Sequence, residues 1–75
     1  MSSFKEVEEI IKLLNLENLT EYAKNVDDAL RGGSTGSEIW GGVRFSLLEI
    51  PSELLSATVK GKINALIKAI DNIMY

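Results

Sequence analysis

The fold class depends on residues 37–50, Ser37-Glu-Ile-Trp-Gly-Gly-Val-Arg-Phe-Ser-Leu-Leu-Glu-Ile50. This stretch fits two structures. In a β-hairpin at 37–48, Gly41-Gly42 would form a two-residue turn, and the apolar residues after it would alternate as in a half-buried strand. In a helix capped by Thr35 or Ser37, the apolar residues would fall within an arc of about 100°. These residues are Ile39, Trp40, Val43, Leu47 and Ile50.

We favour the helix, which we place at 36–50. Pro51 gives it a natural stop, and a lone two-stranded ribbon is marginal in water unless a helix covers it. The Gly41-Gly42 pair costs a helix about 1 kcal/mol per residue. A close approach of another backbone beside Trp40 would give a packing reason for it. The alternative is an α+β fold with the hairpin packed on helices.

The segments on both sides have helical periodicity. Towards the N-terminus we predict helices near 3–14 and 18–31, the second one capped by Asn18 and ended by Gly32-Gly33. Towards the C-terminus we predict a helix near 58–74 that is capped by Thr58. Its apolar stripe consists of Val59, Ile63, Leu66, Ile67, Ile70 and Met74. We therefore expect an all-α, four-helix bundle that forms one domain over residues 1–75, with a Gly/Ser/Thr-rich connection at 32–37.

The side chains present exclude most catalytic chemistry. The chain has no histidine and no cysteine, so it lacks the usual general base, the thiol nucleophile and the common zinc ligands. Neighbouring acids such as Asp27 and Asp28 point about 100° apart on a helix and do not converge on one atom. We expect no enzymatic activity, no metal and no cofactor.

The charge distribution indicates what the chain could bind. The net charge is −3, and residues 1–38 carry eight acidic and four basic side chains. Nucleic-acid binding needs clustered cations, which are missing here. No apolar run reaches the length of a membrane span, and the absence of cysteine fits a reducing compartment. We expect a cytoplasmic protein that binds neither nucleic acid nor membrane.

These exclusions favour a protein that acts by contact with another protein. A small inhibitor, immunity protein or antitoxin-like neutralising protein needs charge and a few anchors, but no chemistry. We predict that Trp40, Arg44 and Phe45 anchor the partner, although Trp40 would also serve to fill the core. Asp27 and Asp28 would steer a partner with a basic surface. Phe45 and Leu48 lie off the main apolar arc and are candidates for an exposed apolar patch.

Two other functions make different demands on the chain. An anion or phosphate ligand would bind backbone N–H groups and hydroxyls in the Gly-rich connection. The residues concerned are Gly33, Ser34, Thr35, Gly36 and Ser37. This connection lacks the lysine of a phosphate-binding P-loop. A self-associating structural or regulatory domain would instead form a homodimer through the Gly41-Gly42 face and the region of Leu48 and Ile50.

Overall fold

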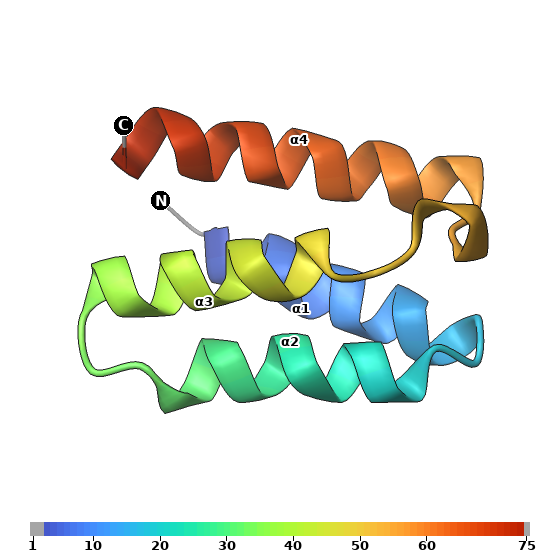
Figure 1. Ribbon diagram of the computed structural model, residues 1–75, viewed down its shortest axis with the longest axis horizontal. Coiled ribbons are helices and arrows are strands. Elements are labelled where there is room, and N and C mark those ends of the chain that lie inside the picture. The colour runs from blue at the N-terminus through green and yellow to red at the C-terminus, as the bar shows by residue number, and fades with distance from the viewer. Residues whose placement is uncertain (1–2, 75) are drawn as a thin grey trace.

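The computed structural model describes residues 3–74, which form four α-helices and one short 3-10 helix. The elements are α1 (Ser3–Leu16), α2 (Thr20–Gly32), α3 (Gly36–Leu48), η1 (Ser52–Leu54) and α4 (Ala57–Met74). Successive α-helices run in opposite directions (Figure 1). α1 and α3 each pack on both α2 and α4, so α1 and α3 lie diagonally opposite. This arrangement is the predicted all-α four-helix bundle.

The core is built from the apolar stripes that the sequence predicts. The described buried apolar residues are all aliphatic, and every α-helix contributes to them. They are Val7, Ile10, Leu14, Ala23, Val26, Leu30, Val43, Leu47, Ile50, Val59, Ile63, Leu66 and Ile70. The side chain of Met74, the last position of the predicted α4 stripe, lies outside the described part.

Residues 37–48 are helical, so the alternative of a hairpin there is wrong. Thr35 caps α3, because its Oγ1 accepts the Glu38 N–H at 3.2 Å. The helix ends at Leu48 rather than at Ile50. Gly42 faces α2, where an added Cβ would lie 3.3 Å from the Cβ of Ala29. One glycine of the pair therefore permits the expected close approach between helices.

The connection between α1 and α2 corrects the predicted role of Asn18. This residue does not cap α2, which begins at Thr20 and has no side-chain cap. Asn18 has a φ of 63°. Its N–H donates to the Asn15 carbonyl, and the Leu19 N–H donates to the Leu14 carbonyl at 2.9 Å. These bonds form a Schellman motif, with an asparagine in the left-handed position that ends α1.

The start of α4 also differs from the prediction, because its cap lies two residues earlier than expected. α4 begins at Ala57, and its cap is Ser56 rather than Thr58. The Ser56 Oγ accepts the Val59 N–H at 3.4 Å, and the same hydroxyl donates to Glu17 at 2.7 Å. The cap thus links α4 to the chain that follows α1.

Candidate protein-binding surface

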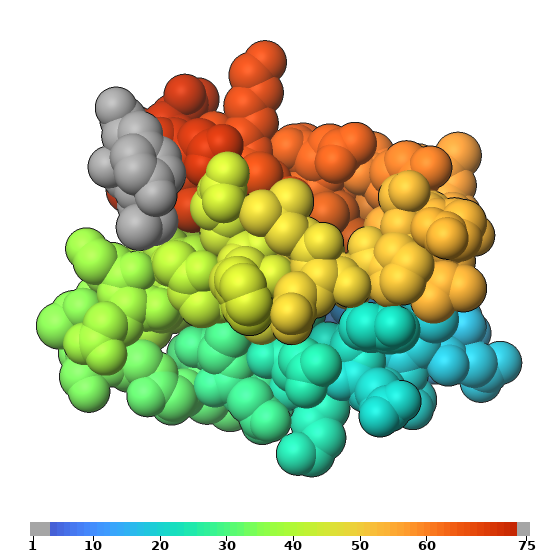
Figure 2. Space-filling view, in the orientation of Figure 1, coloured from blue at the N-terminus to red at the C-terminus, as the bar shows by residue number. Residues whose placement is uncertain are grey.

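The outer face of α3 carries an exposed apolar pair, Phe45 and Leu48, which we call the α3 patch. Phe45 is 63% exposed and Leu48 is 55% exposed. They lie three residues apart, so they are neighbours on the helix surface. The outer face of α3 is directed towards the viewer between α2 and α4 (Figure 2). Large apolar side chains grouped in this way can be buried by a partner.

Trp40 lies apart from the α3 patch. It is half-buried, packs against the core and contacts Phe4 of α1, with ring centroids 5.2 Å apart. Trp40 and Phe45 are five residues apart, which corresponds to a rotation of about 140° around the helix axis. The tryptophan therefore helps to close the end of the bundle where α1 and α3 begin.

Arg44 is engaged within the protein. Its Nε donates to Asp71 Oδ1 at 2.6 Å, and both side chains are partly exposed. This ion pair joins α3 to α4. Asp71 could not be recognised as a partner from the sequence, because the two residues are 27 positions apart. In the conformation described, the guanidinium is tied to α4 rather than extended towards a partner.

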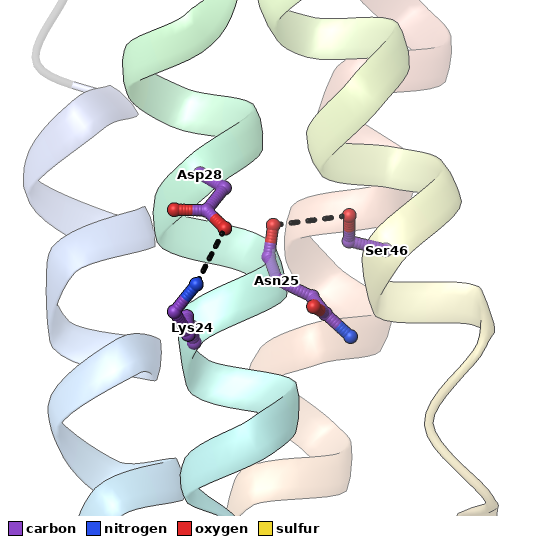
Figure 3. Close-up of polar contacts among 4 residues, drawn as sticks. All are labelled: Lys24, Asn25, Asp28 and Ser46. Carbon is purple, nitrogen blue, oxygen red and sulfur yellow. Dashed lines mark hydrogen bonds and ion pairs between the residues drawn. The ribbon is translucent and has the colours of Figure 1, made fainter.

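The two aspartates chosen for steering are also paired. Asp27 accepts from Arg31 at 2.8 Å, and Asp28 pairs with Lys24 at 3.4 Å (Figure 3). Arg31 also lies 3.9 Å from Glu8 of α1. These cations offset much of the negative charge of Asp27 and Asp28, so these two residues contribute little net field for steering.

The Gly-rich segment 32–37, of which only residues 33–35 connect α2 to α3, has a structural role at the start of α3. Gly33 is half-buried, whereas Ser34, Thr35, Gly36 and Ser37 are exposed. The Thr35 hydroxyl accepts the Glu38 N–H and lies 3.4 Å from the Glu38 carboxylate. An anion bound at these N–H groups would therefore meet a negative charge already present.

A groove of about 420 Å³ between α1 and α2 was not foreseen from the sequence. Its lining combines apolar and charged side chains, and Leu16 is 71% exposed there. The lining residues are Glu8, Ile11, Lys12, Asn15, Leu16, Asp27 and Arg31. Of the two helices that form the groove, α1 is the one diagonally opposite α3.

Comparisons with protein-family models, curated proteins and solved structures find no match to this chain. Within residues 3–74, no helix has both the length and the apolar character that crossing a membrane requires. The same residues contain no group of three or more carboxylates arranged to hold a metal ion. A function for this chain is therefore argued from its surface geometry.

Proposed function

We propose that this chain is a small protein-binding domain that acts by occupying a partner's surface, as inhibitors, immunity proteins and antitoxins do. The observation that carries the proposal is the exposure of Phe45 and Leu48 side by side on α3. Burying a large apolar side chain completely contributes roughly 1.5–3 kcal/mol. A partner that covers both would therefore gain binding energy without any chemical step.

The proposed anchor residues differ from those predicted from the sequence, which were Trp40, Arg44 and Phe45. Phe45 remains an anchor, and Leu48 joins it. Trp40 supports the N-terminal part of α3 through its contact with Phe4. Arg44 holds the helix against α4 through Asp71. We also propose a cytoplasmic location, which the absence of cysteine favours.

The test uses the complete chain as bait in an extract of its native host, followed by identification of the captured protein. Binding of that purified protein is then compared between the wild type, Phe45→Ser and Leu48→Ser. We expect each substitution to raise the Kd about 5- to 30-fold, since each removes about 1–2 kcal/mol of apolar burial. Isothermal titration calorimetry measures the change.

Leu16→Ser is the matched control, because it removes an exposed leucine from α1 at the opposite side of the bundle. Its Kd should stay within twofold of the wild type, and circular dichroism should show the same helical content for all variants. The proposal would be contradicted if Leu16→Ser abolished binding of the partner while both α3 variants still bound it. Sedimentation at several concentrations shows whether the captured partner is a second copy of this chain.

A further inference from the structure

The α3 patch is bordered by two carboxylates, one in the first turn of α3 and one at the residue that directly follows the helix. Glu38 lies seven residues before Phe45, and Glu49 lies four residues after it. At about 100° per residue, these three side chains fall within roughly 40° of one another around the axis. All three are exposed. Phe45 therefore stands in a stripe with a negative charge on each side.

A third carboxylate reaches this surface from α2. The Ser46 hydroxyl donates to the Asn25 carbonyl at 3.4 Å (Figure 3). Ala29, one turn later in α2, lies beside Gly42, one turn earlier in α3. The helices are antiparallel, so Glu21, one turn before Asn25, lies opposite the end of α3 near Glu49. Glu21 is also exposed.

Two cations of the helices that form this surface are engaged with carboxylates of their own. Lys24 pairs with Asp28 at 3.4 Å, and Arg44 pairs with Asp71 at 2.6 Å. Among residues 3–74, no ion pair within 4.0 Å involves any of the three patch carboxylates. These carboxylates are Glu21, Glu38 and Glu49. In the described part of the chain these three carboxylates therefore have no cation at ion-pair distance, and together they favour a positively charged partner.

We infer that the partner binds the α3 patch through a basic amphipathic helix whose apolar face covers Phe45 and Leu48 and whose flanking Lys or Arg side chains meet Glu21, Glu38 and Glu49. This inference rests on the proposed function. An apolar face flanked by cations complements an apolar pair flanked by carboxylates. A second copy of this chain fits less well, because its own patch would bring further carboxylates to the interface.

The probe is an 18-residue helical peptide of leucine and lysine, with leucine at helical spacing on one face. A matched peptide carries glutamate in place of every lysine. Each is titrated into the complete ¹⁵N-labelled chain at low and at high salt. We expect the lysine peptide to shift the amide signals of residues 38–50 and to bind more weakly at high salt. The glutamate peptide should leave those signals unchanged.

Variants of equal charge change separate this surface from the general acidity of the chain. Glu49→Lys should lower the affinity for the lysine peptide about three- to tenfold. Glu6→Lys, on the exposed surface of α1, changes the net charge equally and should alter the affinity less than twofold. The inference would be overturned if the two variants had equal effects or if the two peptides bound equally well. It would also be overturned if the shifted amide signals were confined to α1 and α2.

Failure of this inference differs from failure of the proposed function. Suppose that Phe45→Ser abolishes capture of the native partner while Glu49→Lys has no effect on lysine-peptide binding. The α3 patch would then remain the docking surface, but the partner would not be a basic helix. If Phe45→Ser and Leu48→Ser leave the affinity for the native partner unchanged, the α3 patch is not the docking surface. The proposed function and this inference are then both wrong.

Discussion

The glycines of this chain differ in whether the fold leaves room for a side chain. An added Cβ at Gly33 would lie 2.6 Å from the Ile39 Cγ1 and 2.9 Å from the Ile39 backbone N. Gly33 has an ordinary φ of −80°, so the lack of space, and not the backbone conformation, requires glycine. At Gly61, in α4, an added Cβ would have no neighbour within 4 Å.

Gly33→Ala should therefore lower the free energy of unfolding by about 1–3 kcal/mol, the usual cost of overpacking. The backbone atom of Ile39 cannot move aside as easily as a side-chain tip. Gly61→Ala is the control and should raise the free energy of unfolding by up to about 1 kcal/mol, because alanine favours the helix. Urea denaturation followed by circular dichroism measures both. Equal changes in the two variants would refute the close-contact explanation.

The ends of the helices are determined by short polar contacts. Ser56 begins α4 by accepting the Val59 N–H and also donates to Glu17. Thr58 lies inside the helix and is exposed. Both residue types are good N-caps, so composition alone does not distinguish them. The hydrogen bond to Glu17, 39 residues away, distinguishes Ser56 from Thr58.

We expect Ser56→Ala to lower the free energy of unfolding by about 1 kcal/mol, because the helix loses its cap and the bond to Glu17. Thr58→Ala should change it by less than about 0.5 kcal/mol. Chemical denaturation of the two variants provides the comparison. A larger loss in Thr58→Ala would mean that the helix begins where the sequence first suggested.

The apolar periodicity of each segment was enough to predict the four helices and most of their buried faces. Residues 37–50 were ambiguous because two adjacent glycines favour a turn locally, whereas the contact of Gly42 with Ala29 depends on tertiary packing. The patch residues Phe45 and Leu48 could be predicted because they lie off the apolar arc. The ion pair of Arg44 could not, because it joins residues from different helices.

Ion pairs join neighbouring helices of the bundle. Glu9 of α1 and Lys62 of α4 lie 2.8 Å apart, and Arg44 and Asp71 join α3 to α4. The hydrogen bond from Lys62, followed by its positive charge, lowers the pKa of Glu9 below the ordinary value for glutamate. A lowered pKa in the folded state means that folding favours the ionised carboxylate.

The contribution of Glu9 to stability should therefore be present above the ordinary glutamate pKa, about 4.3, and be lost as the pH falls through the lower folded-state value. Glu9→Gln should be less stable than the wild type near pH 6, and the difference should disappear on acidification. The unfolding temperatures of both proteins, measured between about pH 6 and pH 3, test this expectation. A difference that persisted unchanged at the acidic end would contradict this role for the ion pair.

The contact between Trp40 and Phe4 lies at one end of a bundle whose described buried residues are aliphatic, and this has a spectroscopic consequence. Trp40 is the only tryptophan in the chain, so its fluorescence reports on the junction of α1 and α3 rather than on the aliphatic interior. Local opening at that junction would change the emission while the far-ultraviolet circular dichroism still showed intact helices. Following both signals in one melt would separate fraying of this end from cooperative loss of the bundle.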